Sequence, residues 1–319
     1  MSTELWITMW VLLTLFVFLP AVVFLLTGMM YMSTIKRNKD GKASEPFINN
    51  KSYTASPIKQ LAKQGKEYMQ STTKEEITIT SFDNTKLVGY YFPAPGKTDK
   101  ILIGMHGFKS SPYNGYSPFI KFYHSLGYSL IIPYQRAHGK SEGKYVTMGV
   151  KERLDCLCWV NYAVDRFGSD LEILLHGVSM GGATVCAVSG ENLPPQVKGI
   201  ISDCAYSSLT DEVTHQLKTA IKLPKFPFLK YCELIAKTFA DFDYTSYTPV
   251  DQVKKAKVPM LFVHGKEDNI VPVNCCKKLY ENCASKKQIL LVENANHAES
   301  FAVENELYKK TIIDFFNIK

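Results

Sequence analysis

A five-residue segment, Gly-Val-Ser-Met-Gly at 177–181, has the residue types and spacing of a nucleophile held on a sharp turn. The apolar run 171–175 precedes it and the small-residue stretch 183–188 follows, so a buried strand should lead into the turn and a helix should follow it. Such a turn needs glycine at positions 177 and 181, because side chains there would collide. The pattern predicts Ser179 as a nucleophile flanked by Gly177 and Gly181; the alternative is a tight turn with an incidental serine.

Backbone amides that could stabilise an oxyanion follow another apolar run. His106, Gly107 and Phe108 come directly after residues 101–105. A loop at that strand end can place the backbone N–H of Phe108 beside that of Met180, which gives two donors for the oxyanion of an acyl-transfer reaction. The side chain of His106 is expected to be structural, because the backbone carries this chemistry.

A general base should come after the nucleophile in chain order, as an acid–base pair does in this type of site. Five of the seven histidines precede the serine or fall in the region expected to form a cap: His106, His124, His138, His176 and His215. His264 ends a predicted strand, where its side chain should face the scaffold. His297 lies in a polar loop after the last apolar run and is predicted as the general base; the alternative is a surface loop histidine.

The acid that orients the base is expected just beyond a predicted strand, at Asp268. Glu267 is adjacent but would point elsewhere if Asp268 points inward, and Asp203, at the end of the preceding core strand, is the second choice. The acid holds the imidazole tautomer and stabilises its cation. Ser179, Asp268 and His297 would then form a triad, and its chemistry requires neither a metal ion nor an organic cofactor.

The elements that must position these side chains alternate between strands and helices. Residues 76–81 and 87–92 alternate in polarity and predict an antiparallel pair. Continuously apolar runs then follow, which are typical of strands buried on both faces of a parallel sheet: 101–105, 129–132, 171–175, 199–202, 259–263 and 288–292. Residues 148–167 have apolar side chains at helical spacing. The sequence therefore predicts an α/β fold with a mostly parallel sheet and helices on both faces.

The strand–helix rhythm stops between about residues 206 and 250, where the apolar segment 223–229 lies among helical patterns. We expect a small cap here, inserted after the sixth core strand. Upstream of the sheet, a polar segment is expected to be a linker that contains a short helix over 57–69. The expected domains are a membrane anchor, this linker and a hydrolase domain that includes the cap, at residues 1–35, 36–75 and 76–319.

The N-terminal segment from Leu5 to Ile35 carries no charged side chain. The segment is longer than the ~20 residues that a helix needs to cross a membrane. A cleaved signal peptide is the alternative, but no basic residue precedes the apolar run and no small-residue cleavage site follows it. Basic residues follow the span at Lys36, Arg37, Lys39 and Lys42. This asymmetry predicts a single-pass protein of the cell membrane with its catalytic domain in the cytoplasm.

Composition argues against several other classes. The chain has 319 residues, of which 46% are hydrophobic and 21% charged, as expected for a globular protein. The net charge of +7 is not gathered in any motif that reads nucleic acid, so no such partner is expected. The eight cysteines lack the spacing of a zinc site and are expected to be reduced. The alternative is a disulfide of Cys275 or Cys276 with Cys283.

These motifs together resemble the α/β-hydrolase fold from about residue 76 to the C-terminus. The segment 106–108 resembles the family's oxyanion strand end, 177–181 its nucleophile elbow, and Asp268 and His297 its acid and base positions. Residues 134–143 resemble its R-G-H-G-x-S-x-G loop, with Ala137 in place of the usual glycine. The chain is most similar to membrane-anchored bacterial hydrolases of the Bem46 and YqkD group, loosely related to prolyl oligopeptidase-type peptidases. This resemblance implies a reaction type and little about the substrate.

The favoured function is hydrolysis of a small-molecule carboxylic ester through an acyl-enzyme on Ser179. The apolar cap and the membrane anchor favour apolar or lipid-like acyl groups. Two alternatives stay open: a serine peptidase or aminopeptidase, and a catalytically silent binding protein with the same fold.

Overall fold

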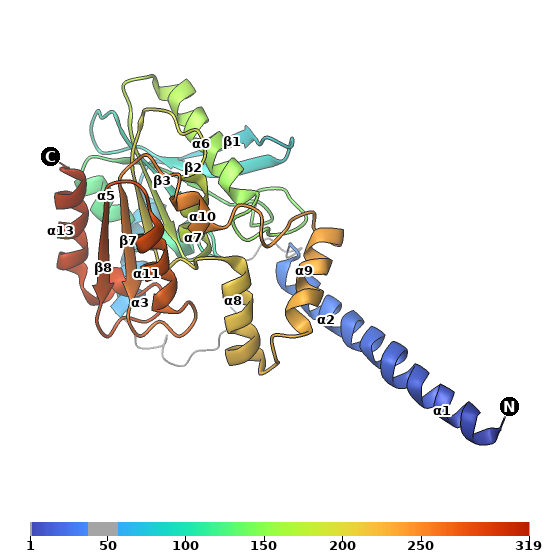
Figure 1. Ribbon diagram of the computed structural model, residues 1–319. Helices are drawn as coiled ribbons and strands as arrows, with labels where there is room; N and C mark the ends of the chain where they lie inside the picture. Colours follow the sequence, from blue (N-terminus) through green and yellow to red (C-terminus); the bar gives the residue numbers. More distant parts are fainter. Residues whose placement is uncertain (1, 38–56, 319) are drawn as a thin grey trace.

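An eight-stranded sheet forms the centre of the computed structural model, which describes residues 2–37 and 57–318 (Figure 1). The strands are β1 (Glu75–Thr80), β2 (Lys86–Phe92), β3 (Lys100–Met105), β4 (Ser129–Pro133), β5 (Glu172–Val178), β6 (Val197–Asp203), β7 (Met260–Gly265) and β8 (Lys287–Val292). Their spatial order is β1-β2-β4-β3-β5-β6-β7-β8. The pairs β1–β2 and β2–β4 are antiparallel, and the pairs from β4 to β8 are parallel. The predicted mostly parallel sheet is confirmed.

Helices cover both faces of this sheet (Figure 1). One face carries α6 (Glu152–Phe167), α7 (Met180–Val188), α10 (Pro249–Val253) and α11 (Val273–Asn282); the other carries α3 (Pro57–Ser71), α4 (Pro112–Tyr116), α5 (Ile120–Ser125), α12 (Ser300–Val303) and α13 (Asn305–Phe316). Successive strand residues point to opposite faces. In β3, Ile101 and Ile103 therefore join the core on one face, and Leu102 joins the core on the other.

Helix α6 begins at Glu152, later than the predicted start at residue 148. Met148 and Gly149 have φ values of 52° and 88°, which a right-handed helix does not allow. The Glu152 carboxylate instead accepts hydrogen bonds from the backbone N–H groups of Thr147 and Gly149, each at 2.8 Å. The apolar spacing could not reveal this loop, because its backbone is held by a side chain inside the helix.

Between β6 and α10 the chain leaves the sheet and forms α8 (Leu209–Gln216), the π-helical turn η3 (Leu217–Ile221) and α9 (Phe228–Phe239). This is the small cap expected in this region. Its buried side chains, which include Leu217, Leu229 and Ile235, form an apolar cluster together with Tyr31 and Ile35 from the N-terminal helix. The cap is therefore packed against the segment predicted to be the anchor.

The N-terminal segment is a continuous apolar helix made of α1 (Thr3–Leu13), the π-helical turn η1 (Thr14–Phe18) and α2 (Leu19–Ile35). Within residues 2–37 and 57–318, it is the one helix long and apolar enough to cross a membrane. The middle of the predicted linker, including Lys39 and Lys42, lies outside the described residues. The short helix predicted over 57–69 is confirmed as α3.

Candidate active site

Ser179 lies on the turn between Val178, the last residue of β5, and Met180, the first residue of α7. Its φ of 59° and ψ of −119° are outside the regions that most non-glycine residues adopt, which costs roughly 1–3 kcal/mol. The backbone N–H of Ser179 donates to the carbonyl of Asp203 at 2.8 Å, which ties the turn to β6. The surrounding structure therefore holds a strained serine at the carboxyl end of the sheet.

The flanking glycines are required because other backbone segments approach them closely. A Cβ atom on Gly177 would lie 2.0 Å from the carbonyl oxygen of Gly181. A Cβ atom on Gly181 would lie 1.9 Å from the carbonyl oxygen of Met105 in β3. Because the chain enters the helix directly after Ser179, α7 begins at Met180 and not at residue 183 as the small-residue stretch indicated.

The structure brings the side chains of Ser179, His297 and Asp268 into one hydrogen-bonded row. His297 Nε2 lies 2.9 Å from Ser179 Oγ, and His297 Nδ1 lies 2.7 Å from Asp268 Oδ2. The three residues follow β5, β8 and β7, whose parallel carboxyl ends meet at one edge of the sheet. With Nδ1 protonated and donating to Asp268, Nε2 is free of a proton and accepts the serine hydroxyl.

The carboxylate of Asp268 is buried and accepts hydrogen bonds at both oxygens. Oδ1 accepts from the backbone N–H groups of Ile270 and Val271, each at 2.9 Å, while Oδ2 accepts from His297. Burial alone would raise the pKa of Asp268, but the charge of His297 and the hydrogen bonds from His264 and His297 outweigh it and hold the pKa well below its usual range. Asp268 is therefore ionised.

His264, which was expected to face the scaffold, is buried and also contacts Asp268. Its Nε2 lies 2.9 Å from the carbonyl oxygen of Val271 and 3.1 Å from Asp268 Oδ2. A proton on Nε2 can thus be shared between these two acceptors, and the buried ring contacts the same carboxylate oxygen as His297. Sequence reasoning set His264 aside as a base and missed this supporting contact, although its spacing of four residues from Asp268 was a usable signal.

The pKa of His297 is raised well above its ordinary value. Burial disfavours the imidazolium, but the sulfur of Cys204 and the carboxylate of Asp268 favour it and together outweigh burial. Of these two groups, Asp268 is the one that is ionised, because burial raises the pKa of the Cys204 thiol to about 11. The site therefore holds a histidine that accepts a proton readily.

If His297 acts as general base in a hydrolytic reaction, kcat/KM should rise with pH and have its midpoint above 6.5, because only a neutral His297 can accept a proton from Ser179. The contribution of His297 to folding stability changes with pH in the direction opposite to the rate. Since the pKa is higher in the folded state, protonated His297 stabilises the fold below pH 6.5, and this contribution is lost as the pH rises through the folded-state pKa. A pH–rate profile and denaturant unfolding across the same range measure both, and a midpoint at or below 6.5 contradicts the expectation.

The loop that carries Phe108 passes directly beside Ser179. A Cβ atom on Gly107 would lie 3.4 Å from the Cβ atom of Ser179. Met180 is the first residue of α7, and the N–H groups of the first helical turn lack partners within the helix. The backbone N–H groups of Phe108 and Met180 therefore belong to the two segments that meet at Ser179.

Two buried histidines hold this loop. His106 Nε2 accepts from the backbone N–H of Gln135 at 3.1 Å, and His138 Nε2 accepts from that of Lys109 at 3.0 Å. Burial lowers the pKa of His106 to about 3 and that of His138 to about 4, so both rings are neutral and can act as acceptors. The expected structural role of His106 agrees with these contacts.

The loop that supplies His138 has Ala137 at a φ of 60°, the conformation for which the usual glycine is suited. Its neighbour Arg136 is buried and bonds the carboxylate of Asp155 through Nε and Nη2, both at 2.6 Å. Arg136 Nη1 also bonds Asp83 at 2.9 Å, in the turn between β1 and β2. These ion pairs fix the loop although alanine replaces glycine.

Asp203, the second choice for the acid, is the last residue of β6, and its carboxylate is bonded elsewhere. Its Oδ2 accepts from the hydroxyl of Tyr308 at 2.9 Å, and its Oδ1 has no hydrogen-bond partner within the described ranges. Burial raises the pKa of Asp203 to about 6. The structure therefore brings Asp268, and not Asp203, to the imidazole of His297.

The thiol of Cys204 lies 4.0 Å from His297 Nε2, and the ligand atoms of Cys204, Asp268 and His297 all lie within 4.8 Å of one another. These three residue types can bind zinc. However, a cation there would take a His297 nitrogen that contacts either Asp268 or Ser179. Metal binding at these atoms would thus compete with the hydrogen-bonded row.

Glu212 is a buried cap residue that sequence reasoning did not single out. Its Oε1 accepts from Gln216 Nε2 at 3.0 Å, and its Oε2 has no hydrogen-bond partner in the described part of the chain. Burial raises the pKa of Glu212 to about 7, and the charges of His297 and Asp268 also act on it. Helix α8 therefore brings a titrating carboxylate within electrostatic range of the candidate site.

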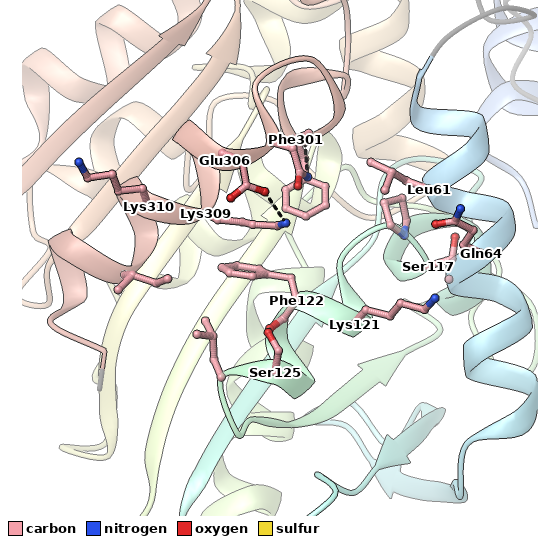
Figure 2. A pocket seen from close by; sticks show the side chains of 15 residues that line it. Leu61, Gln64, Ser117, Lys121, Phe122, Ser125, Phe301, Glu306, Lys309 and Lys310 are labelled. Carbon is pink, nitrogen blue, oxygen red and sulfur yellow. Dashed lines mark hydrogen bonds and ion pairs between the residues drawn. The ribbon is translucent and has the colours of Figure 1, made fainter.

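A separate surface cavity of about 490 Å³ lies on the face of the sheet that carries α3, α5, α12 and α13, between these four helices (Figure 2). Phe122 and Phe301 line it beside the charged side chains of Lys121 and Lys309, and Lys309 is paired with Glu306 at 2.9 Å. None of Ser179, Asp268 and His297 lines this cavity. It is therefore distinct from the candidate active site.

The sheet order and the serine on the turn after β5 define an α/β-hydrolase protein with a serine-hydrolase-type fold. The sequence model of the prolyl oligopeptidase family matches residues 125–317. The chain belongs to that family.

Relatives and solved structures agree with this assignment. YqkD of Bacillus subtilis is 26% identical over 264 residues, which cover 82% of this chain and 86% of YqkD. A membrane protein of Saccharomyces cerevisiae is 26% identical over 244 residues, 76% of this chain and 78% of that protein. The solved structure of the Pyrococcus furiosus esterase Pf2001 aligns with a TM-score of 0.64 and 25% identity over 78% of this chain and 94% of that one. The predicted α/β-hydrolase resemblance is confirmed.

Proposed function

We propose that this protein is a serine hydrolase that cleaves carboxylic esters through an acyl-enzyme on Ser179. The observation that carries the proposal is the unbroken row of hydrogen bonds from Ser179 Oγ through the His297 ring to Asp268. A buried, ionised carboxylate behind a histidine of raised pKa is the arrangement that general-base activation of a serine needs.

In the proposed reaction, His297 Nε2 takes the hydroxyl proton as Ser179 Oγ attacks the ester carbonyl. The resulting imidazolium is stabilised by Asp268, and the backbone N–H groups of Phe108 and Met180 donate to the oxyanion. His297 then gives its proton to the departing alcohol. A water molecule, deprotonated by the same histidine, attacks the acyl-enzyme and releases the acid and Ser179.

We also propose that the N-terminal helix anchors the protein as a single membrane span, with the hydrolase domain on the cytoplasmic side. The length of the apolar helix supports the span, and the basic residues Lys36 and Arg37 directly after it support the orientation. The proposed organisation is an anchor at 1–35, a linker at 36–75 and a hydrolase domain at 76–319. The contact between α2 and the cap means that the end of the anchor is also part of the packed domain.

A peptidase that acts on a free amino terminus is the second candidate, because the family includes prolyl oligopeptidase. Glu212 favours it. A buried carboxylate with an oxygen that lacks a partner in the described ranges, and with its pKa near neutrality, could accept the ammonium group of a peptide substrate. An uncharged ester has no ammonium group that the Glu212 carboxylate could bind.

Chromogenic esters of increasing acyl length, assayed beside aminoacyl amides, separate the two candidates. We expect esters to react faster than amides, and apolar acyl chains longer than acetyl to be preferred. Glu212→Gln should leave ester hydrolysis within about threefold of the wild type, because Gln keeps the size and an acceptor while removing the charge. Faster cleavage of amides, together with a selective loss of amide cleavage in Glu212→Gln, would establish the peptidase instead.

A further inference from the structure

Helix α9 of the cap packs along α2 of the N-terminal helix (Figure 1). The rings of Phe24 and Tyr231 meet edge to face with centroids 5.2 Å apart. One turn further along both helices, a Cβ atom on Gly28 would lie 3.2 Å from Ile235 Cδ1. Because the contacts advance in the same direction, the two helices run parallel. The start of α9 therefore points toward the free, N-terminal part of the apolar helix.

The contact with the cap begins where a membrane span would end. Upstream of Phe24, the side chains from Thr3 to Val23 are exposed or only partly buried. This stretch of about 20 residues is roughly 30 Å long as a helix, which matches the hydrocarbon core of a bilayer. If it fills that core, Phe24 and Tyr231 lie at the level where aromatic side chains meet lipid headgroups.

The chain between α8 and α9 leads directly into the first turn of α9, which carries Tyr231. Figure 1 shows it at the end of the cap, on the side of the domain from which α2 departs. We call residues 217–230 the cap tip. Two apolar side chains of the tip are exposed, Ile221 by 41% and Phe226 by 77%. An apolar surface so placed would face water in a soluble protein.

The charges of the cap tip have one sign. It contains four lysines and no acidic residue: Lys218, Lys222, Lys225 and Lys230. All four side chains are exposed. Exposed aromatic and aliphatic side chains among lysines are the composition of segments that lie in the interface of an anionic membrane.

We propose that the cap tip docks into the anionic leaflet of the same bilayer that the N-terminal helix crosses. Phe226 and Ile221 enter the boundary between headgroups and acyl chains, and the lysines contact lipid phosphates. The proposal rests on the proposed membrane span. It adds a second membrane contact that holds the cap, and with it α8 and Glu212, in a defined position over the active site.

The depth of the tip can be measured in the full chain, placed in nanodiscs at one copy per disc. Phe226→Trp adds one indole at the tip, and Leu307→Trp adds one at an exposed position, 46%, on α13 at the other side of the domain. Lipids brominated in the acyl chain quench an indole that reaches them. In discs with anionic lipid, we expect the emission added by Phe226→Trp to be quenched and that added by Leu307→Trp to be unaffected.

Trp6 and Trp10 in α1 separate failure of docking from failure of anchoring. If they are quenched while the indole of Phe226→Trp behaves like that of Leu307→Trp, the span exists and docking is overturned. If they are not quenched, the span itself is overturned, and docking with it. Quenching at Phe226→Trp that appears only with several copies per disc also overturns the proposal and points to a second copy of the chain as the partner.

The lysines are tested in the same Phe226→Trp background. Changing Lys222 and Lys225 to Gln should weaken partition of the tip about fivefold per lysine in anionic discs, and should have little effect in zwitterionic discs. The matched control changes Lys309 and Lys310 on α13 to Gln and should leave the quenching unchanged. Equal quenching in both lipids, with and without the tip lysines, would overturn the part of the proposal that assigns anionic lipid.

Discussion

Ser179→Ala is expected to lower kcat for ester hydrolysis by about 10⁶-fold and to leave the fold intact. The hydroxyl forms the bond to the acyl group, so its loss removes the two-step path entirely. The methyl side chain of alanine fits where the half-buried serine lies, and the turn is held by the bond from the backbone N–H of residue 179 to Asp203. KM should change far less than kcat, because the amides of Phe108 and Met180 remain.

A fluorophosphonate probe tests this prediction without knowledge of the natural substrate. The wild type should be labelled, and Ser179→Ala should not. Ser189→Ala is the matched control, because Ser189 caps the end of the same helix and its hydroxyl donates to the carbonyl of Cys186, at 2.7 Å. It should be labelled like the wild type. If the wild type takes no label, or Ser179→Ala takes as much, the proposed hydrolase is wrong and the fold serves binding instead.

Asp268→Asn is expected to lower kcat by about 10⁴-fold. The neutral amide cannot stabilise the imidazolium, and its NH₂ group favours the wrong tautomer of His297. In this variant the pKa of His297 should fall, because a charge that raises it is gone. The midpoint of the pH–rate profile should therefore move down together with the loss of rate.

Asp203→Asn is the matched control for the acid. Its amide oxygen can still accept the hydroxyl of Tyr308, and it removes a carboxyl group that burial destabilises when charged. We expect a change in kcat below about tenfold and no loss of stability at pH 7. An equal or larger loss in Asp203→Asn than in Asp268→Asn would show that Asp203 is the acid.

The turn that carries Ser179 could be predicted because its requirements are local. The glycines at 177 and 181, the strand before them and the helix after them lie within a short stretch of chain. The two close approaches at these glycines explain why the pattern is so restrictive. The strands could be predicted equally well, because strands buried on both faces of the sheet have continuous apolar sequences.

The helix boundaries were harder to predict from the sequence. The start of α6 depends on a side chain that binds a loop, and the start of α7 depends on the turn at Ser179. Apolar periodicity reports which face of a helix is buried, and it does not report where the first backbone bond forms.

The sequence by itself determined the order of the elements, the nucleophile turn and the candidates for acid and base, because each leaves a local or periodic pattern. Only the tertiary structure showed that Asp268, and not Asp203, contacts the imidazole, since both lie at the carboxyl ends of core strands and only the path of the loop after β7 brings one of them to His297. It also added His264 behind the acid, and it joined the cap to α2 through Phe24, Gly28 and their partners on α9. These contacts either join residues that are distant in the chain or depend on the conformation of a loop. A local sequence pattern does not show which buried surfaces will pack together.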